Sequence, residues 1–537
     1  MITGRKLPIG VQSYEGLIRD GYVYVDKTMY IYNLVHSGKQ YFLSRPRRFG
    51  KSLLLSAFRA YWEGKKELFE GLAIESMEAE NIGTEACTEN GNQSAWQPHP
   101  VFYFDFNRRA YIEKDALPQM LDTILREYES VYGCVEKHRS LEERFQRLLI
   151  LAHENTGKRC VILIDEYDKP LLETMENEEL EEYNRKVFKG FFSTLKSFDD
   201  HIRFVFVTGV TKFSKVSIFS DLNQLEDISL DEAYSSICGI TEDEISKHLM
   251  PEVHAFAEKK KTDVQHIRER LRNAYDGYHF AADSPGVYNP HSLLSALKKT
   301  RLDYYWFETG TPSFLPRRLR NMSFEMNQFM NGTLNATAET LSDYRDDNPN
   351  LIPLLYQTGY LTLVDYDNVG RYYTLGFPNE EVEYGLLNSL MPEYIPGAGS
   401  GSGKDIISIK RYLETGDVDR IRDVFTALYA SIPYTTGNIP FEHDFQTVIF
   451  LVFTLLGQYV HAEVHSSQGR ADALVETDAF IYLFEFKRDK SANDALQQIE
   501  DSGYAEPYAA DSRKLFKIGV SFDSETRGLK EWKVELK

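Results

Sequence analysis

The chain has 537 residues, 42% of them apolar, and a formal net charge of −20. A chain of this length can bury several cores, so we expect about three or four domains. The acidic balance argues against a broad electrostatic footprint on nucleic acid, whose binders usually neutralise phosphates with lysine and arginine.

The four cysteines, at positions 87, 134, 160 and 238, show no paired metal spacing, so neither a zinc site nor a disulfide framework is expected. The N-terminus lacks a basic region followed by an apolar core, and no uninterrupted apolar run approaches the length of a membrane span. We therefore expect a cytoplasmic protein with no membrane partner.

The first chemical motif is a short apolar strand, a basic turn and a Gly-Lys-Ser, in the segment Gln40 to Ser52, before a helix over Leu53 to Tyr61. This is the context of a P-loop, in which backbone amides and a helix N-terminus cradle phosphates. We predict that Lys51 reaches the β and γ phosphates and that Ser52 binds Mg²⁺. Arg45 replaces the first glycine of the usual pattern. The residues of this segment predicted to bind ATP are Arg45, Arg48, Gly50, Lys51 and Ser52.

A second motif is the apolar run Cys160 to Ile164, which ends in the acids Asp165 and Glu166. A continuous apolar strand is typical of a parallel sheet covered on both faces, and ligands bind beyond the carboxyl ends of such strands. This pattern is typical of a Walker B strand, in which Asp165 holds Mg²⁺ and Glu166 orients or deprotonates the attacking water. The ordinary alternative is a buried strand followed by a helix N-cap acid. Two motifs, each at a strand end, favour nucleotide binding.

Two more strands are predicted, over Pro100 to Phe106 and Ile202 to Thr208, with helical stretches between them. Strands that alternate with helices predict a doubly wound α/β sheet with right-handed crossovers. Thr208, or Thr211 a turn later, lies where ATPases of the AAA type place a polar sensor of the γ phosphate. A strand that ends in threonine is also ordinary.

The middle of the chain carries no clear chemistry. Glu242 to Lys299 is predicted to be mainly helical, and Leu351 to Phe377 to form a helix and a β-hairpin, which suggests a winged-helix-like element. We favour a structural role for it over DNA reading. Pro396 to Lys404 has the composition of a flexible hinge. Its Gly-Ser-Gly-Lys ending resembles a P-loop, but Asp405 stands where Ser or Thr is needed and no buried strand precedes it.

A third motif joins Gly469-Arg470-Ala471-Asp472 to Phe484-Glu485-Phe486-Lys487 through a short turn. Side chains alternate along a strand, so Glu485 and Lys487 share one face. A symmetric reversal sets Asp472 opposite Glu485, about 5 Å apart at Cβ, where two acids repel unless a cation or a proton intervenes. This favours Mg²⁺, with Lys487 facing the bound water or the scissile phosphate. The alternative is a solvated face with an ordinary ion pair, but the apolar run Ile481 to Phe484 indicates a buried strand, where unpaired charge is costly.

The elements around this hairpin are predicted as a helix, three strands, a helix and a strand. They cover residues 442–456, 460–465, 470–476, 480–487, 493–508 and 515–522. This order resembles the core of the PD-(D/E)XK nuclease superfamily and implies a restriction-endonuclease-like α/β domain. In that superfamily the first helix often carries an acid, and the helix after the hairpin can add a glutamine. Ala471 replaces the nominal proline. The matching positions are Glu442, Asp472, Glu485, Lys487 and Gln498, and the resemblance implies that Glu442, Asp472 and Glu485 hold the metal.

Further segments resemble the AAA-ATPase-like family of bacterial and archaeal proteins, whose members commonly end in a PD-(D/E)XK domain. In that family the arginine-rich P-loop, with Arg45 in place of glycine, is the usual form. The matching segments are Leu7 to Gly10, Tyr24 to Thr28, Arg45 to Ser52, Asp165 to Pro170, Tyr275 to Tyr278, Tyr288 to Pro290, Thr309 to Pro312 and Leu375 to Asn379. Turn and packing roles are the default for Asp26 to Thr28, Tyr275 to Tyr278 and Thr309 to Pro312.

The resemblance implies four regions: a P-loop domain (1–241), a helical lid with the winged-helix-like element (242–395), a Gly/Ser linker (396–404) and a nuclease-like domain (405–537). We expect ATP binding and hydrolysis to control a Mg²⁺-dependent nuclease that acts on nucleic acid, with DNA as the expected substrate. The alternative is a nucleotide-dependent switch or scaffold whose nuclease-like domain only binds or assembles; the acidic composition favours it. A homo-oligomer would also fit, because arginine fingers act across subunit interfaces in many ATPases, although no arginine is singled out.

Overall fold

The computed structural model describes residues 4–81, 96–133, 139–175, 177–212, 225–306, 334–342, 350–394, 402–430, 473–477, 479–508, 510–523 and 528–536. These residues form two compact units. The first contains the described residues up to Trp306 and from Leu334 to Glu381, and the second contains those from Val382 onward.

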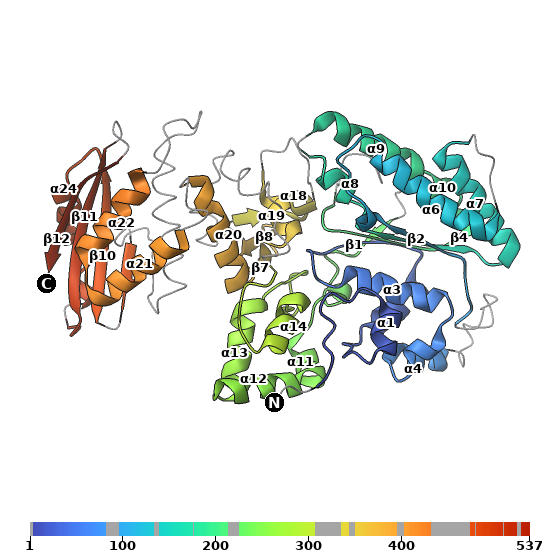
Figure 1. The fold of residues 1–537 in the computed structure, drawn as a ribbon, viewed down its shortest axis with the longest axis horizontal. Helices are drawn as coiled ribbons and strands as arrows, with labels where there is room; N and C mark the ends of the chain where they lie inside the picture. Colours follow the sequence, from blue (N-terminus) through green and yellow to red (C-terminus); the bar gives the residue numbers. More distant parts are fainter. Residues whose placement is uncertain are drawn as a thin grey trace. The chain divides into compact units, whose positions relative to one another are not determined.

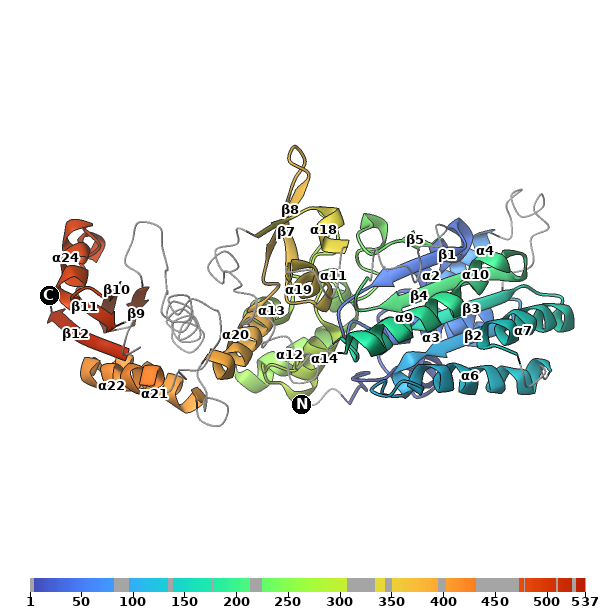
Figure 2. The same ribbon diagram turned by 90° about the horizontal axis from the view of Figure 1, so that it is seen from above.

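A five-stranded parallel sheet forms the centre of the first unit (Figure 2). Its order is β2-β3-β4-β1-β5, and every neighbouring pair is parallel. The predicted α/β parallel sheet is therefore confirmed, and the carboxyl ends of β1 and β3 lie on the same edge. The strands are β1 (Gln40–Ser44), β2 (Val101–Asp105), β3 (Cys160–Asp165), β4 (Ile202–Gly209) and β5 (Glu226–Asp227).

Helices cover both faces of this sheet (Figure 1). On one face the ring of Phe58 packs against Phe206, with the centroids 4.8 Å apart. On the other face Phe145 stacks on Phe191 at 4.8 Å and contacts Phe104 at 5.3 Å. This double cover explains why β3 is buried along its whole length and apolar from Cys160 to Ile164. The helices are α1 (Tyr14–Arg19), α2 (Thr28–Ser37), α3 (Lys51–Trp62), α4 (Ala73–Asn81), α6 (Ala116–Tyr132), α7 (Leu141–Thr156), α8 (Lys169–Leu172), α9 (Glu178–Phe192) and α10 (Thr194–Ser197).

The predicted helical region follows as α11 (Glu242–His248), α12 (Met250–Lys260), α13 (Val264–Tyr275) and α14 (Pro290–Lys299), called the lid below. Its core also takes in Leu7 and is flanked by Ile9 and Val25. The N-terminal segment therefore packs against the lid. The helices of the lid contribute Ile245, Val253, Phe256, Ile267, Leu271, Leu293 and Leu297 to this core, and Leu249 joins it from between α11 and α12.

The predicted helix and hairpin are also present, as α19 (Ile352–Thr358), β7 (Thr362–Asp367) and β8 (Tyr372–Gly376). With β6 (Leu334–Ala336) the hairpin forms an antiparallel sheet of order β6-β8-β7, and α18 (Ala338–Ser342) precedes α19. We call these five elements the winged-helix-like element. Gly359, at φ +91°, ends α19 in the left-handed conformation that favours glycine.

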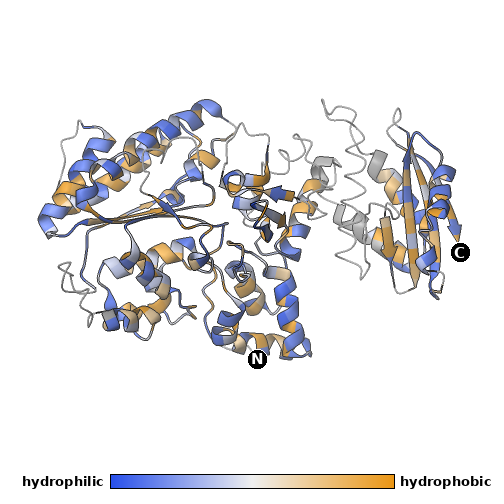
Figure 3. Ribbon diagram, turned by 180° about the vertical axis from the view of Figure 1, so that it is seen from behind, coloured by the Kyte–Doolittle hydropathy of each residue, from blue (hydrophilic) through white to orange (hydrophobic). Residues whose placement is uncertain are grey.

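The second unit contains a four-stranded mixed sheet of order β12-β11-β10-β9, in which only β10 and β11 are parallel. Its strands are β9 (Ala473–Glu476), β10 (Phe480–Arg488), β11 (Lys514–Asp523) and β12 (Gly528–Leu536). Its helices are α21 (Ser402–Thr415), α22 (Val418–Ala430) and α24 (Ala492–Asp501), and α20 (Glu380–Tyr394) leads into it. Figure 3 shows hydrophobic residues along these strands.

Three predictions differ from this structure. Helix α21 begins at Ser402, so residues 402–404 are helical rather than part of the linker. Helix α24 ends at Asp501 rather than near residue 508, because Gly503 takes a left-handed φ of +64° directly after it. Strand β12 was not predicted. The predicted helix over 442–456 and strand over 460–465 lie outside the described residues. Across the described part of the chain, no helix has both the length and the apolar character needed to cross a bilayer.

Candidate nucleotide-binding and nuclease sites

The P-loop between β1 and α3 is shaped by two left-handed residues, Arg48 at φ +69° and Gly50 at φ +95°. Gly50 directly precedes the first residue of α3, and glycine adopts this conformation without steric cost. Lys51 is buried, and its Nζ donates hydrogen bonds to the carbonyl oxygens of Arg45 at 2.8 Å and Pro46 at 3.0 Å. The loop therefore curls around its own lysine.

The two residues predicted to hold Mg²⁺ come together at the ends of β3 and the P-loop. Asp165 is 2% exposed, and Thr208 donates a hydrogen bond of 2.8 Å to its Oδ1. Burial raises the pKa of Asp165, although hydrogen bonds from Ser52 and Thr208 favour the charged carboxylate and oppose this shift. A buried carboxylate beside a hydroxyl fits Mg²⁺, which usually takes one or two carboxylates and completes its shell with phosphates and water.

Glu166 follows Asp165 in an unusual backbone conformation, with φ at +50°. A non-glycine residue in this region is strained, and such residues gather at functional sites. The strand therefore breaks directly after Asp165. Glu166 lines the same cavity as Lys51 and Ser52, as its predicted role requires.

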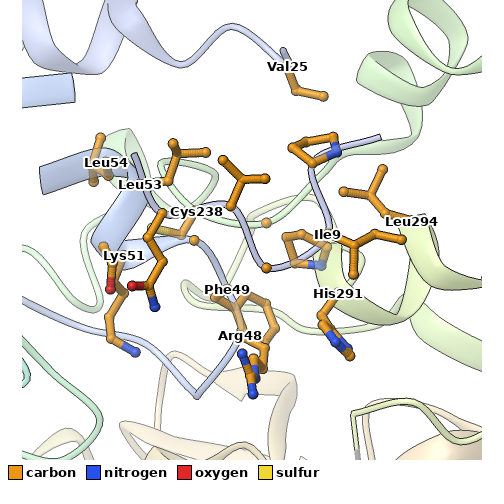
Figure 4. Close-up of a pocket in the computed structure, with 18 of the residues that line it drawn as sticks. Ile9, Val25, Arg48, Phe49, Lys51, Leu53, Leu54, Cys238, His291 and Leu294 are labelled. Atoms are coloured by element: carbon orange, nitrogen blue, oxygen red, sulfur yellow. The ribbon is translucent and has the colours of Figure 1, made fainter. Parts of the chain in front are cut away.

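The cavity beside the P-loop has a volume of about 510 Å³, within the usual range for small-molecule sites. Charged side chains, among them Arg48, Lys51 and Glu166, line part of it, and apolar side chains such as Ile9 and Leu294 line another part. Figure 4 labels Arg48, Lys51, Ile9 and Leu294. This division suits a nucleoside triphosphate, with charged phosphates and a flat, largely apolar base. The apolar and lid residues, which come from segments far apart in the sequence and were not predicted, are Ile9, Val25, Leu53, Leu54, Cys238, His291 and Leu294.

The predicted ATP contact of Arg45 is corrected by the structure. Its side chain is 1% exposed and does not line the cavity. The guanidinium donates to the carbonyl oxygens of Ser229 at 2.8 Å and Tyr234 at 3.0 Å, and lies 4.0 Å from the ring centroid of Phe280. Because both terminal nitrogens of the guanidinium donate to backbone carbonyl oxygens, Arg45 anchors the segment from Ser229 to Tyr234 instead of pointing into the cavity.

The segment Asp26 to Thr28 has contacts that account for it. Asp26 Oδ1 accepts hydrogen bonds from the amide and hydroxyl of Thr28, and its Oδ2 accepts one from the amide of Ala73 in α4. The buried Lys27 donates to both carboxylate oxygens of Glu244 in α11, at 2.6 and 2.7 Å. This segment therefore ties the N-terminal helices to the lid.

The segment Tyr275 to Tyr278 has a packing role beneath the P-loop. Tyr278 is buried and meets Phe49 edge to face, with ring centroids 4.8 Å apart. Gly277 takes φ +91°, and a Cβ there would lie 2.0 Å from the carbonyl oxygen of Pro378. Thr309 to Pro312, the other segment without predicted chemistry, lies outside the described residues.

In the second unit β9 and β10 pair antiparallel from Ile481↔Glu476 to Phe484↔Ala473. This register confirms the predicted reversal between Glu476 and Ile481. Asp472 and Glu442, two of the predicted metal ligands, lie outside the described residues. Among the residues that the structure describes, no three His, Cys, Asp or Glu side chains gather as metal ligands would.

The remaining three predicted residues of this site come together on the sheet face that α24 covers. Glu485 is 1% exposed, and Nζ of Lys487 donates to its Oε1 at 2.9 Å. The same Nζ donates to the side-chain oxygen of Gln498 in α24. Gly519 stands beside Glu485 in the parallel ladder, and a Cβ there would lie 2.3 Å from the carbonyl oxygen of Ala492. Glycine thus lets α24 approach this face closely.

The first unit, with its P-loop and acid-ended strand on one edge of a parallel sheet, defines a P-loop α/β protein. Residues 8–219 match the model of the predicted AAA-ATPase family, and residues 440–532 match that of the PD-(D/E)XK nuclease superfamily. The chain belongs to the AAA-ATPase-like family and carries a C-terminal PD-(D/E)XK nuclease superfamily domain. A relative from Azotobacter chroococcum mcd 1, described as an uncharacterized protein in the vnfD 5' region, is 35% identical over 548 residues and 99% of each chain.

Two solved structures align with much of the chain. They are the ORC2 protein of Aeropyrum pernix in ADPNP–ADP complexes (10% identity, 71% of this chain, 93% of that one) and Cdc6p from Pyrobaculum aerophilum (11%, 72% and 94%). The TM-score is 0.22 for both, so neither likeness carries an argument about this chain.

Proposed function

We propose that the first unit binds and hydrolyses ATP with Mg²⁺, and that this reaction controls a Mg²⁺-dependent nuclease in the second unit. The nuclease acts on nucleic acid, with DNA as the substrate. The main support for ATP hydrolysis is the cavity that Lys51, Ser52 and Glu166 line together, beside Asp165.

For ATP hydrolysis, the ammonium of Lys51 exchanges its carbonyl partners for oxygens of the β and γ phosphates. Ser52 and Asp165 hold Mg²⁺, which neutralises charge on the phosphates when bound. Glu166 orients or deprotonates the attacking water. Thr208 holds Asp165 through its hydroxyl, as a sensor of the γ phosphate would.

For the nuclease, the buried Glu485 is proposed as a Mg²⁺ ligand together with Asp472 and Glu442. Lys487, 2.9 Å from Glu485, faces the attacked phosphate and assists hydrolysis. Gln498 holds the ammonium of Lys487 in place. A bound Mg²⁺ adds positive potential where it is needed, so a net charge of −20 does not exclude a nucleic-acid substrate.

A second candidate is a nucleotide-dependent switch or scaffold whose nuclease-like domain binds or assembles without cleavage. The net charge of −20 favours it, because a strongly acidic protein attracts DNA poorly. In this case Lys487 serves only to pair Glu485. The two candidates share the ATP site and differ in cleavage.

The test measures phosphate release from ATP and cleavage of linear, circular and single-stranded DNA, with Mg²⁺ or Mn²⁺ and with or without ATP. It compares the wild type with K51A, K487A and K490A, the last being a control because Lys490 is an exposed lysine close to the same site. We expect K51A to lose phosphate release, and K487A alone to lose metal-dependent cleavage in every nucleotide condition. Phosphate release without cleavage of any substrate would instead support the scaffold.

A further inference from the structure

The residues that follow β4 are held by one buried carboxylate that the proposed reaction does not use. Asp168 is 1% exposed, and its Oδ2 accepts hydrogen bonds from the amide of Val210 at 2.9 Å, the amide of Thr211 at 2.6 Å and the hydroxyl of Thr211 at 2.8 Å. Such a carboxylate fixes both the position and the direction of the strand end.

Tyr167 strengthens this clamp. Its amide donates a hydrogen bond to the carbonyl oxygen of Thr208 at 3.1 Å, and its hydroxyl donates one to the carbonyl oxygen of Thr211 at 3.0 Å. A Cβ on Gly209 would lie 2.7 Å from the Tyr167 ring and 2.9 Å from Oδ1 of Asp168. The two residues after Glu166 therefore hold the backbone from Thr208 to Thr211, and the hydroxyl of Thr208 contacts Asp165.

The same strand end continues into the winged-helix-like element. The amide of Lys212 donates to Oε1 of Gln357 at 2.8 Å, and Nε2 of Gln357 donates to the carbonyl oxygen of Leu341 at 2.6 Å. Gln357, in α19 and 5% exposed, therefore links the segment that follows β4 to α18 inside the unit. Helix α19 also meets the P-loop, because a Cβ on Gly359 would lie 2.7 Å from Cβ of Pro46.

We propose that the strand end from Thr208 to Lys212 senses the bound nucleotide and passes its state to helix α19 through Gln357, with Asp168 as the positioning residue of this relay. This relay rests on the proposed ATPase, and the response of helix α19 would be the structural consequence of nucleotide binding there.

The physical reason is the cost of breaking the buried bonds. Leaving the amide of Lys212 or the side-chain oxygen of Gln357 without a hydrogen-bond partner away from water is unfavourable. When ATP and Mg²⁺ engage Asp165, any displacement of Thr208 therefore moves Gln357 and α19 with it, because the bonds between them stay intact. Without the clamp at Asp168 the strand end would adjust locally, and α19 would not respond.

The test uses the full chain and measures ATP binding, the split between kcat and KM, and hydrogen exchange of residues 352–358 with and without a non-hydrolysable ATP analogue. The variants are D168N, which keeps the shape of the side chain, T211V, which removes one hydroxyl and leaves both amides, and Q357L. I352A, at the other end of α19, controls for loss of helix stability.

We expect the analogue to change exchange of α19 by about fivefold or more in the wild type and in I352A, and not in Q357L, which still binds ATP. D168N and T211V should lower kcat by about tenfold with KM little changed, and should lose the response of α19. A wild type that binds ATP without any change in α19 overturns the relay. An unchanged kcat, or equal losses of ATP binding and kcat in both D168N and T211V, overturns the positioning role. Failure of the ATPase itself is separate, because it appears as absent binding or phosphate release in the wild type.

Discussion

Nζ of Lys487 donates a hydrogen bond of 2.9 Å to Oε1 of Glu485, and the two side chains are 18% and 1% exposed. The lysine therefore has a structural role as well as its proposed chemical one. Removing one partner of a buried pair leaves an uncompensated charge, whereas replacing both partners can be nearly neutral. Any loss of cleavage in K487A must be separated from loss of folding.

We predict that K487A lowers the free energy of unfolding by about 1–3 kcal/mol, because Glu485 loses its charged partner. The double variant E485Q/K487M should recover most of this loss and still lack metal-dependent cleavage. Urea denaturation measures the stability, with K490A as the control. A K487A protein as stable as the wild type would show that Glu485 does not depend on this lysine.

The second prediction concerns the close approach of α24 to β11. In G519A the new Cβ would lie 2.3 Å from the carbonyl oxygen of Ala492 and 2.9 Å from Cγ of Leu496. The helix must move away from the sheet, which should cost about 1–3 kcal/mol and displace Gln498 from Lys487.

Thermal denaturation and DNA cleavage measure the effect of G519A. The control is G376A in β8, where, apart from the two chain neighbours, the one described heavy atom within 4 Å of a Cβ belongs to the exposed side chain of Val364. The close packing would be refuted if G519A and G376A shifted Tm equally.

Local patterns were enough to predict the parts of each site that lie along one or two elements. The apolar runs of β1 and β3 predicted the edge at which Lys51 and Asp165 meet. The alternation in β10 and the symmetric turn predicted its register with β9. In these cases the periodicity of one strand, or two adjacent strands, carries the whole signal.

Other features depend on contacts between distant segments, which no local pattern carries. Arg45 turns toward Ser229 and Tyr234 because their carbonyl oxygens lie beside it in the fold. The apolar side of the cavity gathers residues from the N-terminal segment and the lid. Strand β12 alternates Trp532 and Val534 with charged residues, a signal that could have been recognised, but it is weak because an edge strand is only half buried.

A third prediction tests the corrected role of Arg45. In R45K a single ammonium replaces the two terminal nitrogens of the guanidinium, so a carbonyl oxygen of Ser229 or Tyr234 loses its hydrogen-bond donor. This should lower the free energy of unfolding by about 1–3 kcal/mol. We expect a lower Tm but little change in the ATP affinity of the folded protein. K51A should instead bind ATP weakly, and it should also lower Tm because the carbonyl oxygens of Arg45 and Pro46 lose their donor. Equal losses of ATP affinity in folded R45K and K51A would return Arg45 to the phosphate site.

The fourth prediction concerns pH and the pair His153 and His201, whose Nδ1 atoms lie 3.0 Å apart. A hydrogen bond between them requires one nitrogen to donate and the other to accept, so both rings cannot be cationic. Burial, followed by the charges of His201 and Arg159, lowers the pKa of His153 below its ordinary value of 6.5. The unfolded chain therefore takes up this proton at a higher pH than the folded protein does.

The difference in proton uptake between the folded and unfolded chains sets the direction in which stability changes with pH. The contribution of His153 to stability is full above pH 6.5 and is lost as the pH falls from 6.5 through the lowered pKa of the folded protein. The variant H153Q can still form a hydrogen bond with His201 but cannot titrate. We expect its Tm to fall less than that of the wild type between about pH 8 and pH 5, because its residue 153 takes up no proton on unfolding. Thermal scans across this range measure the difference, with H254Q, a substitution of an exposed histidine on α12, as the control. Parallel Tm curves for wild type and H153Q would mean that His153 has the same pKa in the folded and unfolded chains.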